Sequence, residues 1–152
     1  NDFIGIQYYH TDNIKWSPFF DGKCGFIDTK NSNSWTTDVG WDIYPEGIYH
    51  FLKRAQKYKK PIYITENGIA DKKDFQREKF IKESLKQIAR AIGEGADVRG
   101  YFYWSLLDNF EWDKGFGPRF GIIEVDHKTG KRKVKESAHV LTESCRQLLP
   151  GG

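Results

Sequence analysis

The sequence contains no methionine among its 152 residues, and Cys24 and Cys145 are its only cysteines. Without a methionine the chain cannot include its own translational start, so we expect it to be processed or part of a longer protein. The two cysteines lack metal-type spacing and do not argue for a disulfide framework. Cys145 falls on an apolar helical stripe, and we interpret it as a small core residue.

Long apolar runs and a strong charge of one sign are also missing. No stretch is long enough to cross a membrane as a helix, and no signal peptide is visible, which predicts a cytoplasmic location. The formal net charge is +3, the two signs are mixed along the chain, and the four histidines form no ligand pattern. We therefore expect no nucleic-acid partner, no membrane partner, no metal and no other cofactor.

Aromatic residues, in contrast, make up 16% of the chain. They are dense in Tyr101–Trp112, which begins like a buried parallel strand and then turns polar at Asp108, Asn109 and Glu111. Parallel α/β folds place their chemistry at the carboxyl ends of their strands, so the stretch indicates the floor of a site. An aromatic core strand followed by a capped loop explains the same composition, and both interpretations stay open on composition alone.

A strand followed by an amphipathic helix occurs three times along the chain. The patterns predict strands at residues 2–9, 61–65 and 98–105. We expect residues 10–44 to form a long irregular loop, ordered by Trp16, Trp35 and Trp41, and residues 121–134 to form a β-hairpin. The predicted apolar helix faces comprise Ile48, Phe51, Leu52 and Ala55, then Ile81, Leu85, Ile88, Ala89 and Ile92, and finally Val134, Ala138, Leu141, Cys145 and Leu148.

Three strands joined by helical crossovers predict a parallel sheet with two unpaired edges and one uncovered face. A closed barrel removes both problems, but it needs about eight strands and roughly 250 residues. The chain is therefore either a small layered α/β domain or three-eighths of a barrel, and the missing methionine favours the barrel. In that case we expect uncovered apolar surface from Ile4, Ile6, Ile62, Ile64, Phe102 and Trp104.

Four motifs in order resemble glycoside hydrolase family 1, the β-glucosidase family, and the resemblance covers the whole chain. The motifs are Asp2–Tyr9, Gly40–Gly47, Ile64–Gly68, and Trp104–Trp112 with Arg119-Phe120-Gly121. The resemblance implies that residues 1–152 are the C-terminal portion of a single (β/α)8 TIM-barrel domain. They would supply its sixth to eighth strands with their helices, and they would be incomplete alone.

The resemblance also implies an activity, the hydrolysis of terminal non-reducing β-D-glycosyl residues with retention. Family members use two carboxylates, one of which attacks the anomeric carbon to form a covalent glycosyl-enzyme. By its motif Glu66 would be this nucleophile, and Tyr9 occupies the position whose hydroxyl bonds it. Without the resemblance, Glu66 is better interpreted as a turn or helix-entry carboxylate.

The family pattern further implies a set of sugar contacts in this chain. Glu111 would accept from two sugar hydroxyls, and Trp112 would donate to a third. Trp104 would lie under the sugar ring, with Phe120 at the border of the pocket. Because members acting on 6-phosphorylated sugars replace the Glu111-Trp112 pair, we expect neutral β-glycosides. Gln7 stands where the family usually has asparagine, so the substrate-binding role of this position is in doubt.

The acid/base glutamate of the family lies in an Asn-Glu-Pro motif, which this sequence lacks. Proton transfer by such a group typically contributes about 10²–10⁴-fold. We therefore expect the chain to be inactive alone and to need the N-terminal barrel portion as its partner. A non-catalytic carbohydrate-binding or vestigial half-barrel module and a purely structural, self-associating half-barrel are the alternatives.

Overall fold

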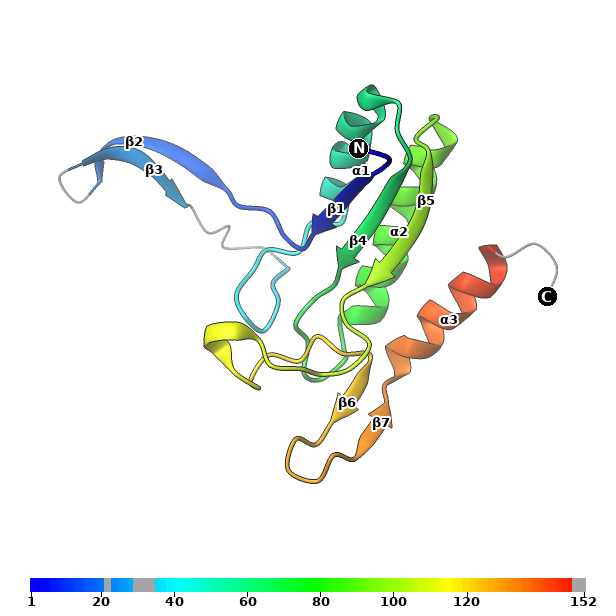
Figure 1. The fold of residues 1–152 in the computed structure, drawn as a ribbon. Helices are drawn as coiled ribbons and strands as arrows, with labels where there is room; N and C mark the ends of the chain where they lie inside the picture. The colour runs from blue at the N-terminus through cyan, green and yellow to red at the C-terminus, as the bar shows by residue number, and fades with distance from the viewer. Residues whose placement is uncertain (21–22, 29–34, 149–152) are drawn as a thin grey trace.

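The computed structural model describes residues 1–20, 23–28 and 35–148. At its centre lies a parallel sheet of β1 (Ile4–Tyr8), β4 (Ile62–Asn67) and β5 (Val98–Tyr103), in the order β1-β4-β5 (Figure 1). The three strands predicted from the sequence are thus confirmed. Because β4 is the middle strand, the residues at its carboxyl end have neighbours on both sides.

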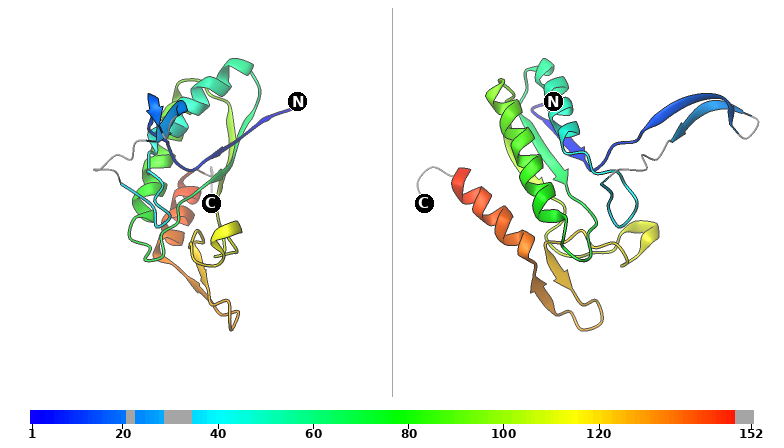
Figure 2. Two further views of the ribbon diagram at one scale, coloured as in Figure 1. Left: turned by 90° about the vertical axis from the view of Figure 1, so that its left-hand side faces the viewer. Right: turned by 180° about the vertical axis from the view of Figure 1, so that it is seen from behind.

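Each of these strands is followed by a helix, as predicted. α1 (Glu46–Ala55), extended by η1 (Gln56–Tyr58), and α2 (Arg77–Gly93) cover one face of the sheet, and α3 (Glu136–Leu148) packs beside α2 (Figure 2). Pro45 directly precedes α1, where its fixed φ suits a helix start. None of the helices that the structure describes is both long and apolar enough to span a membrane.

The core lies between the sheet and α1 and α2. Ile62 and Ile64 are fully buried and Ile6 is 8% exposed, packed against Ile48 and Leu52 of α1. The prediction that these three strand isoleucines would supply uncovered surface is therefore wrong. Alternate strand residues point to opposite faces, and the isoleucines point toward the helices.

The opposite face of the sheet carries no helix from the described part of the chain (Figure 2). Its side chains are polar and aromatic, and exposed ones include Gln7 and Phe102, the latter at 57%. At its edge Phe3 packs edge-on against Tyr63, with ring centres 5.3 Å apart. Within the described part of the chain, the outer strands β1 and β5 are each paired on one side only, so this sheet is open at both edges.

A β-hairpin occupies part of the segment that we predicted to be irregular. β2 (Ile14–Phe20) and β3 (Lys23–Asp28) pair antiparallel and extend away from the rest of the molecule (Figure 1). Trp16 is 58% exposed on this hairpin. Cys24 belongs to β3, and its side chain lies outside the described part.

The C-terminal third contains the expected second hairpin, β6 (Ile123–Val125) and β7 (Arg132–Val134). Val134 thus ends a strand and is not part of the α3 face. The buried position predicted for Cys145 is wrong, because its thiol is exposed. Helix α2 also differs in detail, since Phe80, Ser84 and Ala91 are buried where Ala89 and Ile92 are exposed.

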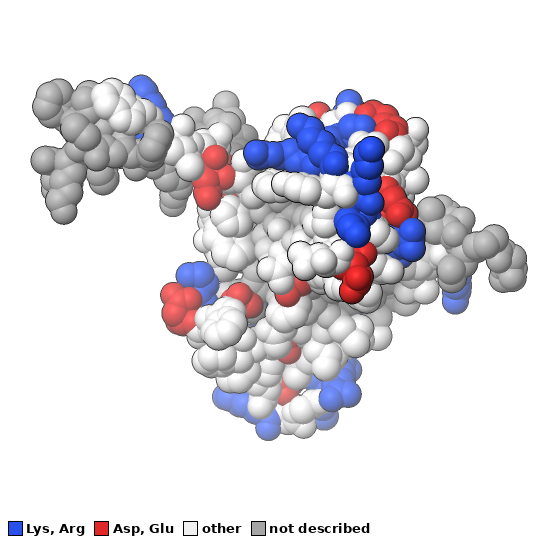
Figure 3. All heavy atoms as spheres, turned by 45° about the horizontal axis from the view of Figure 1, so that its top comes forward, with Lys and Arg blue, Asp and Glu red and all other residues white. Residues whose placement is uncertain are grey.

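Lysine and arginine side chains gather over the amino ends of the strands (Figure 3). Exposed Lys57, Lys59 and Lys60 directly precede β4 at this end. The polar residues singled out by the motifs, in contrast, follow the carboxyl ends of the strands. The basic surface and the candidate site are thus on opposite ends of the sheet.

Candidate active site

A β-bulge at the end of β4 sets the direction of Glu66. Up to Ile6, β1 pairs with β4 through Ile64, but the next pair is Gln7 with Glu66, so Thr65 has no partner of its own. The Thr65 hydroxyl instead donates to the Ile6 carbonyl at 3.2 Å. Bulges of this kind re-aim a side chain. Here the bulge places Glu66 beside the β1 residues that face away from the helices.

Both carboxylate oxygens of Glu66 are held by donors from one neighbouring segment. Gln7 Nε2 donates to Oε1 at 2.8 Å. The hydroxyl of Tyr9, which follows the end of β1, donates to Oε2. Burial, the hydrogen bond and the charge of Glu66 together raise the pKa of Tyr9, so this hydroxyl keeps its proton and remains a donor.

Aromatic side chains hold Tyr9 in place. Its ring lies edge-on to Trp41 and to Phe120, with ring centres 6.0 and 6.1 Å away. Trp41 in turn stacks on His10 at 4.5 Å and packs against Phe120 at 6.1 Å. Edge-on and offset contacts of this kind are the favourable arrangements of aromatic rings. The cluster gives Tyr9, and through it Glu66, a rigid support.

Structural roles fall to Asn67 and Gly68, which complete the motif after Glu66. Asn67 is fully buried; its amide donates to the Tyr8 carbonyl at 2.7 Å and accepts from the Tyr101 hydroxyl at 3.0 Å. It therefore joins β4 to both neighbouring strands. A β-carbon on Gly68 would lie 1.7 Å from the Trp104 carbonyl oxygen, so only glycine fits there.

Glu111 lies in the loop after β5, directly before η2 (Trp112–Lys114). Partial burial is the main cause that raises its pKa, and the negative charges of Asp113 and Glu66 add to the effect while Lys114 opposes it. The negative charge of Glu66 therefore acts on the carboxylate of Glu111. Trp112, at 84% exposure, projects into solvent from the same loop.

A buried ion cluster fixes both ends of this loop. The side chain of Asp108 is fully buried; it accepts from the Gly121 amide at 2.9 Å and pairs with Lys135 at 3.2 Å and Arg119 at 3.5 Å. Lys135 also donates to the Gly121 carbonyl at 2.7 Å. The cluster thus ties the residue that starts the loop to the residue that follows Phe120.

The structure brings together most of the residues that the motifs indicated. Gln7, Tyr9, Glu66 and Phe120 form one connected group, with Glu111 in electrostatic reach. Trp104 is half-buried and donates its backbone N–H to the Asn67 carbonyl at 3.0 Å. Sequence reasoning missed the support of Trp41 and the buried cluster of Asp108, Arg119 and Lys135, although charged residues directly after a core strand were a signal for Asp108.

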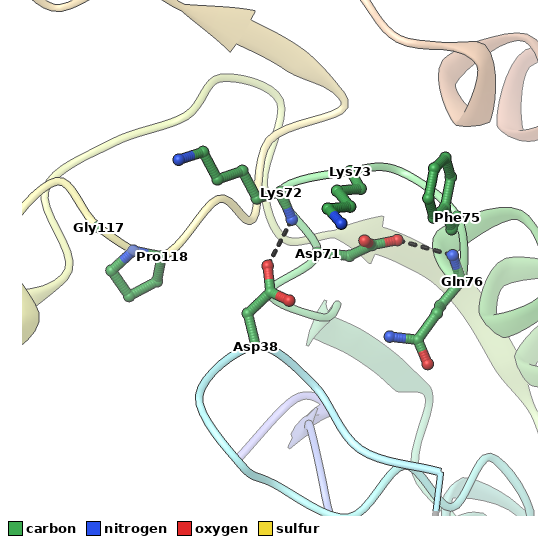
Figure 4. Close-up of a pocket in the computed structure, with 8 residues that line it drawn as sticks. All are labelled: Asp38, Asp71, Lys72, Lys73, Phe75, Gln76, Gly117 and Pro118. Atoms are coloured by element: carbon green, nitrogen blue, oxygen red, sulfur yellow. Dashed lines mark hydrogen bonds between the residues drawn. The ribbon is translucent and has the colours of Figure 1, made fainter.

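A surface hollow of about 680 Å³ is lined by none of these residues (Figure 4). Its carboxylates are already occupied: Asp38 accepts from the Lys72 amide at 2.6 Å, and Asp71 accepts from the amides of Gln76 and Arg77 at 2.8 and 3.0 Å. Asp71 thereby satisfies backbone N–H groups at the N-terminus of α2. The carboxylates of this hollow therefore have a structural role, whereas the candidate site lies on the open face of the sheet. Lining residues are Asp38, Asp71, Lys72, Lys73, Phe75, Gln76, Gly117 and Pro118.

The fold and the site define a parallel α/β protein with a carboxylate centre at the carboxyl end of its middle strand. Residues 1–147 match the model of glycosyl hydrolase family 1, and the chain belongs to this family.

Curated and solved relatives agree with this assignment. The chain is 42% identical to Beta-glucosidase A of Thermotoga maritima over 91% of its length, and 39% identical to a beta-galactosidase of Sulfolobus acidocaldarius over 95%. A solved family 1 β-glucosidase from Thermotoga maritima superimposes with a TM-score of 0.86 and 38% identity over 99% of the chain. This chain spans 33%, 31% and 36% of these three proteins, respectively. Family 1 glycosidases have a TIM barrel, of which this chain covers about a third.

Proposed function

We propose that residues 1–152 form the C-terminal portion of a single (β/α)8 barrel domain and supply its sixth to eighth strands. Three parallel strands with their helices on one face, two open sheet edges and an uncovered opposite face support this proposal. The remaining barrel, on the same or a separate polypeptide, would pair with the outer strands β1 and β5. It would also supply the acid/base glutamate that this sequence lacks.

We further propose that Glu66 is the nucleophile of a retaining β-glycosidase. The observation that carries this proposal is the pair of hydrogen bonds from Gln7 and Tyr9, one to each carboxylate oxygen. Donors to a carboxylate favour its ionised form, which a nucleophile needs. Its position at the end of the middle strand places it where parallel barrels carry their chemistry.

The reaction would proceed in two displacements. Glu66 attacks the anomeric carbon, the bond to the leaving oxygen breaks, and that oxygen takes a proton from the acid/base glutamate of the remaining barrel. Water, deprotonated by the same glutamate, then attacks the anomeric carbon and releases Glu66. Tyr9 and Gln7 keep their protons throughout and hold the carboxylate in position.

Glu111, Trp112, Trp104 and Phe120 are the proposed contacts to the terminal sugar. Glu111 suits paired hydroxyls because ionised acceptors form the stronger hydrogen bonds. An acid at this position would repel a 6-phosphate, which favours neutral β-glycosides as substrates. The relatives named above include a beta-glucosidase and a beta-galactosidase, and Glu111 can accept from either epimer at the 4-hydroxyl.

Labelling with a 2-fluoro-β-glycoside tests the proposal. The chain, assembled with an upstream portion of a family 1 barrel, should form a stable adduct that peptide mapping places on Glu66. Glu78→Gln, at an exposed position of α2, is the control and should label normally, whereas Glu66→Gln should not label. An adduct on another carboxylate would refute the assignment, and sugar binding without any adduct would favour the non-catalytic binding module.

A further inference from the structure

The hydrogen bond from Gln7 to Glu66 differs from the role that the family pattern implies for Gln7. Gln7 is placed among the sugar contacts by its motif, yet its amide nitrogen donates to Glu66 Oε1 at 2.8 Å. We propose that Gln7 is a positioning residue for Glu66. It fixes the orientation of the attacking carboxylate and does not contact the sugar. This inference rests on the proposed function of Glu66 as nucleophile.

The geometry of the strands makes this contact specific. The bulge at Thr65 advances β4 by one residue, so that Glu66 and not Thr65 stands opposite Gln7 in the register. Gln7 and Tyr9 are two residues apart, and alternation of strand side chains directs both to the face away from the helices. One segment therefore supplies both donors, and the bulge brings the carboxylate to them.

Two donors restrict the carboxylate more than one does. The last torsion of a glutamate side chain is broad, so a carboxylate held by Tyr9 alone could turn about it. A second donor on the other oxygen removes this freedom. Holding a reacting group in a near-attack orientation is a large source of rate enhancement.

The side chain of Gln7 has no competing partner among the described residues, since its one hydrogen bond there is to Glu66. Tyr9, in contrast, is held by the Trp41 and Phe120 rings as well as by its hydrogen bond. Removal of the Gln7 amide should therefore affect the carboxylate without disturbing the aromatic cluster. This separation makes the inference testable by substitution.

The test uses the chain assembled with the upstream barrel portion and measures the rate of Glu66 labelling by an aryl 2-fluoro-β-glycoside as a function of its concentration. An activated aryl leaving group needs no protonation, so the maximal labelling rate reports the attack by the carboxylate. Gln7→Met removes the donor at similar size. We expect its maximal labelling rate to fall about tenfold. The inhibitor concentration giving half-maximal labelling should not change.

Gln7→Glu is a second, independent variant, because it replaces the donor by a second carboxyl group beside Glu66 and should lower the maximal labelling rate further. Gln56→Met is the matched control; its amide donates to the Glu94 carbonyl at 3.1 Å, at the opposite end of the sheet, and its labelling rate should stay as in the wild type.

Two results would overturn the inference, and they can be told apart. If both Gln7 variants keep the wild-type maximal labelling rate while the half-maximal inhibitor concentration rises, Gln7 contacts the sugar, and Glu66 remains the nucleophile. If the wild-type assembly itself fails to label Glu66, the proposed function is wrong and the role of Gln7 falls with it. A lowered maximal labelling rate at unchanged half-maximal concentration supports the inference.

Discussion

The backbone of Gly68 passes directly against the carbonyl group of Trp104, and a β-carbon on Gly68 would lie 1.7 Å from that oxygen. The turn after Glu66 and the end of β5 are thus in contact without any side chain between them. Trp104 also donates its N–H to the Asn67 carbonyl at 3.0 Å, so the contact belongs to a continuous backbone pairing. The position of the nucleophile candidate depends on this close approach.

Gly68→Ala should therefore disrupt the site and the fold together. The added methyl group has backbone on its far side and nothing flexible to displace, so we expect a loss of about 1–3 kcal/mol or more in unfolding free energy. Gly93→Ala is the matched control, because a β-carbon there meets nothing within 4 Å. Urea unfolding of the assembled protein measures both, and equal stability of the two variants would show that the turn can relax.

Several features of the fold followed from the sequence because they depend on local pattern. Apolar runs bounded by glycine and proline gave the strands, and Glu66 was found because a motif marks a strand end. The bulge at Thr65 was not predictable, since it arises from the pairing of β4 with its neighbours β1 and β5 and leaves no local signal. The hairpin of β2 and β3 was missed although Asp21-Gly22 between two apolar stretches is a turn signal. Cys145 was misplaced because helical periodicity alone does not fix which neighbours a helix has.

Glu111→Gln should weaken sugar binding and turnover together while the fold stays intact. A charged acceptor becomes a neutral one, which costs on the order of 1–3 kcal/mol in binding. Inhibitor affinity and aryl-glucoside kinetics of the assembled protein measure the effect. Glu124→Gln on β6 is the control, because Glu124 is exposed. Wild-type kinetics in Glu111→Gln would show that this residue does not face the sugar.

The raised pKa of Glu111 gives a pH dependence of sugar affinity. Its charged form is the stronger acceptor, so affinity is full above this pKa and falls as the pH drops through it. Because burial raises the pKa above the usual value of 4.5, the loss should begin at a higher pH than for an ordinary glutamate. Inhibitor titration between pH 4 and pH 7 measures it, and Glu111→Gln should remove this component.

Lys135→Met should destabilise the assembled protein strongly. The side chains of Asp108 and Lys135 are 0% and 7% exposed, and removing one partner of a buried pair typically costs about 3–5 kcal/mol. Arg119 remains near Asp108 at 3.5 Å and should offset part of the loss. Lys82→Met is the control, because its ion pair with Glu78 is exposed and should contribute only a few tenths of a kcal/mol. Similar unfolding free energies for both variants would contradict a role of the cluster in holding the loop.

The chain expressed alone should self-associate or aggregate. β1 and β5 each have one unpaired edge, and such edges are templates for pairing with other chains. The exposed aromatic side chains Phe3, Phe102 and Phe110, at 53%, 57% and 61%, add apolar surface to the unpaired edges.

In the proposed barrel, the upstream portion offers parallel strands for both edges of this sheet. Adding that portion should therefore restore a defined size and β-glycoside hydrolysis at the same time. Gel filtration with light scattering and an aryl-glucoside assay, run on the chain with and without the upstream portion, measure the two effects. The matched control is an upstream portion whose acid/base glutamate is replaced by glutamine; it should restore the size but not the hydrolysis of substrates with poor leaving groups. A cooperatively unfolding monomer of this chain without any partner would instead establish a small α/β domain that is complete in itself.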